Sequence, residues 1–181
     1  MSLAIGLAGS LTSPSRSTGL VEHVLRRLAE GGFQTEMVEL AQLPADALLA
    51  RRKDAGLDAL LQRVTGVDVL VVGTPIYRAS YTGQLKALFD LLPRDALAGT
   101  AVGLIATGGI PQHALAIDHG LRPLVSSLSG LSAARAVYAT DAELADFPKG
   151  PLPDPVAEQL RALADELTGL RARATADTGR P

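Results

Sequence analysis

The chain has 181 residues with a formal net charge of −2 at neutral pH, and it contains no cysteine. This length predicts a single domain, here residues 1–171, with a substantial core, and the small charge offers no bulk attraction to nucleic acid. The lack of cysteine excludes disulfides, thiolate catalysis and iron–sulfur ligation, and His23, His113 and His119 are not spaced as a metal site.

The first element is an apolar run of strand length, residues 3–8, followed by a turn of small and hydroxylic side chains, residues 10–18. A helical pattern of apolar residues begins at Arg16. The first N–H groups of a helix have no partner within it, and the helix dipole favours negative charge there. With its hydroxyls and the Arg16 guanidinium, this turn is suited to hold a phosphate, although hydroxyl side chains are also ordinary helix caps.

Four more segments have strand character, and helical patterns alternate with them. The second strand alternates apolar and polar residues like a half-buried edge strand, whereas the third and fourth are continuous apolar runs that predict burial on both faces. The predicted strands are residues 33–40, 67–73, 101–107 and 133–138, and the predicted helices are residues 58–64, 84–92, 112–128 and 156–170. Residues 46–53 are short and amphipathic and predict a helical turn.

Two features of the second half stand out. Pro123 falls inside the predicted helix 112–128, where its missing N–H should kink or bulge the helix near His119. Residues 141–155 are acidic and proline-rich and predict a surface excursion, and residues 172–181 are too poor in apolar side chains to pack, which predicts a disordered tail.

The alternation of strands and helices predicts an α/β fold: a doubly wound, five-stranded parallel sheet of order 2-1-3-4-5 with helices on both faces. In such sheets the ligand lies beyond the carboxyl ends of the strands, where the strand order reverses. Three conspicuous loops follow buried strands, residues 10–18, 75–82 and 107–109. We expect them to meet at one edge of the sheet and to form the ligand site.

The second and third loops are suited to a flat ring. The sequence TPIYRASYTG offers backbone amides, a rigid Pro75 and two tyrosines, Tyr77 and Tyr81, which could instead pack in the core or between subunits. The sequence ATGG offers backbone N–H groups that glycine leaves accessible. The first loop has neither a P-loop lysine nor a GxGxxG sequence, which favours a single phosphate. A phosphate site and a flat-ring site together describe FMN.

Four motifs carry a resemblance to a known family: GSLTSPSRST, TPIYRASYTGQLKALFDLLP, ATGG and HALAIDHGLRPLVSSL. Together, over about residues 3–140, they resemble the NADPH-dependent FMN reductases of the flavodoxin-like superfamily, in particular the branch that supplies reduced flavin to sulfonate monooxygenases. The resemblance implies a flavodoxin-like fold and an NAD(P)H:FMN oxidoreductase that passes a hydride from NADPH, with NADH not excluded, to FMN. It also implies a flavin-dependent monooxygenase as partner.

The resemblance further implies which residues contact the flavin. The phosphate would be held by Ser10, Ser15, Arg16, Ser17 and Thr18, the ribityl chain and ring by Pro75, Ile76, Tyr77 and Arg78, and the ring edge by Thr107, Gly108 and Gly109. No residue is expected to act as a catalytic acid or base, and no metal is expected. His119 matches the position of an inserted residue that forms a π-bulge at the subunit interface, although it could simply fill that interface. Separately from the resemblance, the apolar character of the third and fourth predicted helices suggests a homodimer or homotetramer.

Three other functions remain open from the sequence. A flavodoxin-like carrier would hold FMN and pass single electrons, a quinone or azo reductase of the same fold would act without free FMN, and a domain of this fold could bind a phosphate ligand that is not a flavin. Arg78 is either an exposed loop charge or an anion contact to NADPH. No membrane-spanning run and no signal peptide are recognisable, so we expect a cytoplasmic protein.

The phosphate turn leads to a first prediction. Replacing Arg16 by alanine removes a guanidinium from the predicted site, and FMN should therefore bind more weakly. The measurement is a titration of wild type and Arg16→Ala with FMN, followed by flavin fluorescence. Equal affinities would count against the phosphate turn.

Overall fold

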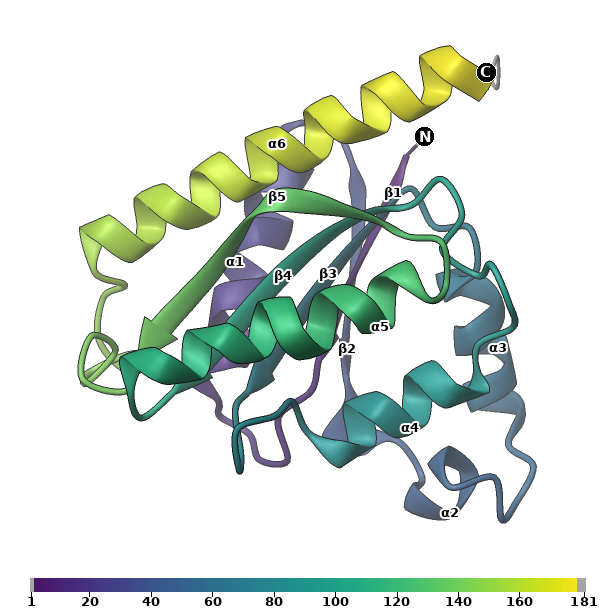
Figure 1. Ribbon diagram of the computed structural model, residues 1–181, viewed down its shortest axis with the longest axis horizontal. Helices are drawn as coiled ribbons and strands as arrows, with labels where there is room; N and C mark the ends of the chain where they lie inside the picture. Colours follow the sequence, from purple (N-terminus) through teal and green to yellow (C-terminus); the bar gives the residue numbers. More distant parts are fainter. Residues whose placement is uncertain (1, 179–181) are drawn as a thin grey trace.

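The computed structural model describes residues 2–178 of the chain. It is built around one parallel five-stranded sheet of order β2-β1-β3-β4-β5, so the predicted doubly wound fold and strand order are confirmed (Figure 1). The strands are β1 (Leu3–Ala8), β2 (Gln34–Glu39), β3 (Val69–Pro75), β4 (Ala101–Gly108) and β5 (Leu131–Thr140). The helices are α1 (Arg16–Glu30), α2 (Ala45–Leu48), α3 (Ala55–Val64), α4 (Gly83–Leu91), α5 (Arg122–Ser126) and α6 (Asp154–Thr178).

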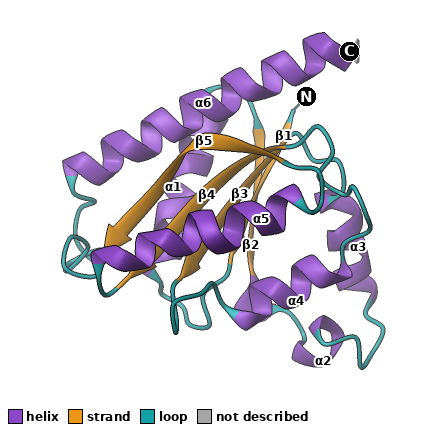
Figure 2. Cartoon of the chain, in the orientation of Figure 1, coloured by secondary structure: helices purple, strands orange, loops and turns teal. Residues whose placement is uncertain are grey.

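Helices cover both faces of the sheet and divide the core into two layers. On one face α1 and α6 pack on the sheet, and on the other face α3, α4 and α5 do so (Figure 2). The central strands β3 and β4 are buried over nearly their whole length, as their continuous apolar sequences predict. All strands run in the same direction, so their carboxyl ends and the loops that follow them share one edge of the sheet.

Two glycines let α1 approach the sheet closely. A Cβ atom placed on Gly73 would lie 2.2 Å from Cγ2 of Val21, and one placed on Gly6 would lie 2.6 Å from Cγ1 of the same valine. Real Cβ atoms do not approach other atoms this closely. The absence of a side chain at Gly6 and at Gly73 therefore lets α1 pack close to the sheet, next to the hydroxyl-rich turn that precedes it.

The predicted helix 112–128 is a composite of three geometries. A 3-10 turn at Pro111–Ala114 leads to a π-helical turn at Ile117–Leu121, and α5 follows directly. Pro123 has no N–H to donate to the carbonyl of His119, so regular α-helical bonding fails at the junction between the π-helical turn and α5. The sequence predicts an irregularity at this place, but not the 3-10 turn before it.

The last helix is longer than its pattern predicts. The sequence predicts a helix end at Leu170 and a disordered tail at residues 172–181, whereas α6 continues to Thr178. Arg171 supports this extension, because its Nη2 atom lies 2.5 Å from Oδ1 of Asp68, the residue directly before β3. Residues 179–181 of the predicted tail lie outside the described residues. Within residues 2–178, no helix combines the length and the apolar composition that a bilayer-spanning segment needs.

The close approach of α1 yields a second prediction. Gly73→Ala should lower the free energy of unfolding by about 1–3 kcal/mol, because the added methyl group overpacks the contact with Val21. Gly83→Ala, at the start of α4, is the matched control: no atom lies within 4 Å of the added Cβ, and alanine is the better helix former. Urea unfolding of both variants makes the comparison, and equal midpoints would contradict the packing argument.

Candidate functional site

A cleft of about 580 Å³ lies at the carboxyl edge of the sheet. Its walls come from the loops that follow β1, β3, β4 and β5, so the three loops that the sequence singles out do meet there. The lining residues are Ser10, Thr12, Pro14, Ser15, Arg16, Pro75, Ile76, Tyr77, Thr107, Gly108, Gly109, Asp141, Ala145, Asp146, Phe147, Pro148 and Lys149.

Hydrogen bonds join the loops after β1 and β3 beneath the cleft. The N–H of Gly9 donates to the carbonyl of Gly73 at 2.7 Å. The hydroxyl of Thr82 donates to the carbonyl of Gly9 at 2.6 Å, and the side-chain amide of Gln84 donates to the carbonyl of Ser10 at 2.6 Å. The sequence TGQ at residues 82–84, which begins α4, therefore holds the hydroxyl-rich turn against the neighbouring loop.

Backbone hydrogen bonds also join the walls after β4 and β5 to their neighbours. The N–H of Ile76 donates to the carbonyl of Thr107 at 2.7 Å, which joins the loop after β3 to the end of β4. The N–H of Asp141 donates to the carbonyl of Gly108 at 2.9 Å, which joins the end of β4 to the loop after β5. The four walls are thus connected through their backbones, and the cleft is preorganised.

In the described part of the chain, the N-terminus of α1 has no side-chain cap. Ser15 has extended backbone angles at the N-cap position, but its side chain makes no capping hydrogen bond, and its Oγ atom instead lies 3.1 Å from Oγ of Ser17. The hydroxyl of Ser10 shapes the turn through the backbone of Thr12. Uncapped amides and hydroxyls at a helix start are suited to bind an anion.

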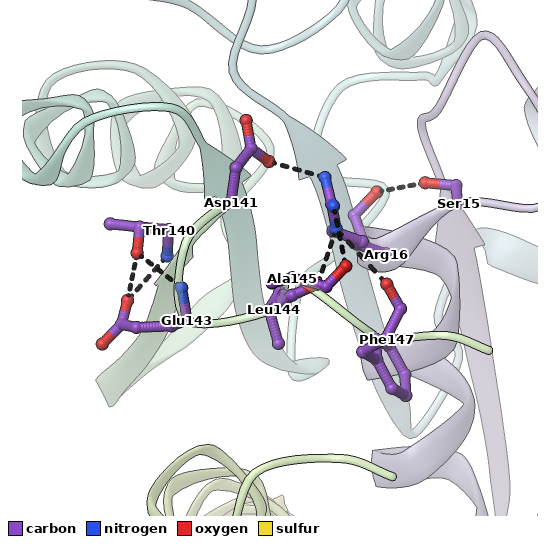
Figure 3. Close-up of polar contacts among 9 residues, drawn as sticks. Ser15, Arg16, Thr140, Asp141, Glu143, Leu144, Ala145 and Phe147 are labelled. Atoms are coloured by element: carbon purple, nitrogen blue, oxygen red, sulfur yellow. Dashed lines mark hydrogen bonds and ion pairs between the residues drawn. The ribbon is translucent and has the colours of Figure 1, made fainter. Parts of the chain in front are cut away.

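Arg16 has partners inside the protein, as Figure 3 shows. Its Nε atom donates to the carbonyl of Leu144 at 2.9 Å and to that of Phe147 at 3.3 Å, and its Nη1 atom lies 3.1 Å from Oδ1 of Asp141. The guanidinium therefore joins the start of α1 to the loop after β5. Its contact with a phosphate stays a prediction.

The loop after β3 has a tight turn at its tip. Tyr77 and Ser80 exchange two backbone hydrogen bonds, at 2.9 and 3.1 Å, and the two residues between them have positive φ angles, 52° for Arg78 and 63° for Ala79. Positive φ at both central positions defines a type I′ turn and is strained for residues with a side chain. The turn places Tyr77 in the wall of the cleft and leaves Arg78 exposed outside it.

The last position of β4 requires a glycine, Gly108. A Cβ atom there would lie 2.7 Å from Oη of Tyr138 and 3.1 Å from Nδ1 of His113. The Tyr138 phenol donates to the carbonyl of Ile110 at 2.6 Å. Burial, with smaller contributions from the carboxylates of Asp141 and Glu143, raises the pKa of Tyr138, which extends to higher pH the range in which the phenol can donate this bond.

Nine of the twelve residues predicted to contact the ligand line the cleft: Ser10, Ser15, Arg16, Pro75, Ile76, Tyr77, Thr107, Gly108 and Gly109. Ser17, Thr18 and Arg78 do not line it; Ser17 and Thr18 are buried in the first turn of α1, and the Thr18 hydroxyl has no hydrogen-bond partner among the described residues. Thr12 and Pro14 lie in the predicted loop 10–18 but are not among the predicted contacts, and sequence reasoning missed the wall formed by residues 141–149 altogether. Only the proline-rich composition of that segment marked it, as a loop.

His119 lies in the π-helical turn and is exposed, away from the residues that line the cleft. Its placement at a subunit interface stays a prediction. Among the described residues, no group of three or more His, Asp or Glu side chains is arranged to hold a metal ion.

The cleft fits FMN in size and in chemistry. Its volume lies within the roughly 300–1,000 Å³ typical of small-molecule sites. An uncapped helix start beside hydroxyl groups suits a phosphate, while apolar Ile76, aromatic Tyr77 and the glycine backbone after β4 suit a flat ring with polar edges. The strand order defines a flavodoxin-like fold, and the cleft lies at the switch point of its sheet, where such folds bind ligands.

Comparison with known proteins gives the family. The chain matches the NADPH-dependent FMN reductase family over residues 3–144. It is 42% identical over 147 residues to the NADH-dependent FMN reductase SfnE of Pseudomonas putida, with 79% of each chain covered. It is 38% identical over 146 residues to an FMN reductase (NADPH) of Escherichia coli strain K12, with 79% of this chain and 75% of the relative covered. The apo crystal structure of the NADH:FMN oxidoreductase EMOB is similar with a TM-score of 0.83 at 33% identity, covering 96% of this chain and 90% of that one.

The chain belongs to the NADPH-dependent FMN reductase family. The predicted family, the prediction of a flavin-reductase enzyme, and the predicted ligands FMN and a nicotinamide nucleotide are confirmed by these matches. The individual residue contacts, the partner monooxygenase and the number of subunits stay predictions.

A third prediction concerns pH and the base of the loop after β5. The Glu143 carboxylate accepts hydrogen bonds from N and Oγ1 of Thr140, at 2.8 and 2.7 Å, and these bonds lower the pKa of Glu143. A lowered pKa contributes stability that is present above the ordinary glutamate value of about 4.3 and is lost as the pH falls through the folded value. Urea unfolding between pH 7 and pH 3 should therefore show a smaller acid loss for Glu143→Gln than for wild type.

The control for this experiment is Glu158→Gln, an exposed position on α6. It should follow the wild-type pH profile. If the Glu143→Gln profile runs parallel to wild type as well, the carboxylate does not hold the base of this loop.

Proposed function

We propose that the protein catalyses the reduction of FMN by NAD(P)H and releases the reduced flavin to a flavin-dependent monooxygenase. The observation that carries this proposal is the preorganised cleft at the carboxyl edge of the sheet, with an uncapped helix start in the wall after β1 and a glycine backbone in the wall after β4. The printed names of the relatives, which describe FMN reductases, support it.

In this proposal each wall of the cleft has its own task. Ser10, Ser15 and the first-turn amides of α1 hold the phosphate, Pro75, Ile76 and Tyr77 flank the ribityl chain and ring, and the backbone of Thr107, Gly108 and Gly109 binds the ring edge. When bound, the flavin supplies the hydride-accepting chemistry, which needs no protein acid or base. The protein binds and orients the two nucleotides and keeps the ring against one wall.

The partner and the setting of the reaction are the finer part of the proposal. The resemblance to reductases that serve sulfonate monooxygenases points to organosulfur metabolism, in the cytoplasm, where nicotinamide nucleotides are regenerated. Two exposed apolar side chains beside the π-helical turn, Ile110 at 48% and Leu115 at 59% exposure, support a homodimer or homotetramer that uses this region. Relatives are named for NADH as well as for NADPH, so both nucleotides are candidates.

The assay that tests the activity is NAD(P)H oxidation by the purified protein as a function of added flavin. We expect turnover that rises with the FMN concentration, since the reductase releases its product. FAD and riboflavin, each with NADH and NADPH, complete the set. An electron carrier would give no turnover, and a quinone or azo reductase would act on its acceptor without free FMN; either result would contradict the proposal.

A further inference from the structure

The wall of the cleft after β5 contributes a lysine that the family motifs do not include. Lys149 lines the cleft together with Asp141 and Asp146, and all three belong to the proline-rich segment that follows β5. The family match ends at residue 144, so this lysine lies beyond it. The inference below rests on the proposed function and adds a residue to its ligand site.

The segment that carries Lys149 is held firmly to the start of α1. Arg16 donates to three of its carbonyls and pairs with Asp141, and Leu144 is fully buried. The ring of Phe147 lies over Gly19, where an added Cβ would come within 2.6 Å of its Cζ atom. Lys149 is thus attached to a fixed wall beside the hydroxyl-rich turn.

A backbone hydrogen bond closes the last turn of the segment around this lysine. The N–H of Gly150 donates to the carbonyl of Asp146 at 2.7 Å, so the residues on either side of Lys149 are ordered. An ordered backbone reduces the entropy that the lysine loses when it binds a ligand.

The charged side chains that line the cleft indicate that Lys149 is available to bind an anion. Four charged side chains line the cleft, Arg16, Lys149, Asp141 and Asp146, and their formal charges sum to zero. The Arg16 charge is already paired with Asp141 at 3.1 Å, whereas Lys149 forms no ion pair in the part of the chain that the structure describes. Without Lys149 the cleft would carry a net charge of −1 and would repel a dianion.

We propose that Lys149 binds a phosphate monoester of a bound nucleotide, and that Arg16 is a positioning residue that holds the wall on which Lys149 stands. Two ligands of the proposed reaction carry this group: FMN carries it on the ribityl chain, and NADPH carries it on the adenosine ribose. Riboflavin and NADH are the matching ligands that lack it.

The test compares wild type with Lys149→Gln, which removes the charge and leaves a polar, somewhat shorter side chain. Titrations followed by flavin fluorescence measure FMN and riboflavin binding, and steady-state assays measure KM for NADPH and NADH. Loss of one charge-assisted contact should weaken binding of a phosphate-bearing ligand about tenfold at low salt and less at high salt. The ligand of the same pair that lacks the phosphate should bind unchanged.

The two pairs of ligands distinguish the two sources of phosphate. A loss for FMN but not for riboflavin assigns Lys149 to the flavin phosphate, and a loss for NADPH but not for NADH assigns it to the adenosine phosphate. Equal effects within both pairs, or no effect in either, overturn the proposal. Lys149→Arg keeps the charge and should therefore retain most of the wild-type affinity for the phosphate-bearing ligand. This variant also covers the case in which Lys149→Gln folds poorly.

Two further variants complete the design. Asp146→Asn removes an anion from the same wall and should strengthen binding of the same phosphate-bearing ligand. Arg16→Ala should weaken binding of the same phosphate-bearing ligand, because it loosens the wall that carries Lys149. This loss should largely vanish when Lys149→Gln is already present, whereas a direct contact of Arg16 with the phosphate would add to the loss caused by Lys149→Gln. A wild-type protein that binds FMN but oxidises neither nucleotide would contradict the proposed function and would leave the flavin comparison at Lys149 intact.

Discussion

The structure depends on a row of backbone hydrogen bonds that runs across the carboxyl edge of the sheet. The N–H of Gly9 donates to Gly73, the N–H of Ile76 donates to Thr107, and the N–H of Asp141 donates to Gly108. Each bond joins the end of one strand to the loop of its neighbour. A parallel sheet places these loops side by side, but only such bonds bring them into one cleft with fixed walls, and a fixed cleft loses little entropy when it binds its ligand.

A second set of contacts adds the wall after β5 to this arrangement. Arg16, at the first position of α1, reaches a segment more than 120 residues later in the chain and satisfies its carbonyls. The close packing of α1 on Gly6 and Gly73 holds this helix, and with it Arg16, against the sheet. Glycines in the strands, an arginine in the turn and a proline-rich loop therefore act together, and the charges that face the cleft follow from their arrangement.

The sequence predicted most of the fold and much of the cleft, for identifiable reasons. Short, continuous apolar runs such as residues 101–107 are typical of buried strands, and glycine- and hydroxyl-rich loops after such strands indicate the ligand edge of the sheet. The wall at residues 141–149 could not be predicted, because its position depends on the long-range contacts of Arg16, which leave no local pattern. The extension of α6 past Leu170 could not be predicted for the same reason, because Arg171 is held there by a distant residue, Asp68.

The central claim is that one cleft at the carboxyl edge of the sheet holds one flavin, with its phosphate at the hydroxyl-rich turn and its ring at the glycine backbone after β4. The most direct measurement is a crystal structure of the protein soaked with FMN. The account predicts electron density for the phosphate at residues 10–18 and for the ring beside residues 107–109. FMN bound at another place, or bound in this cleft with its two ends reversed, would contradict it.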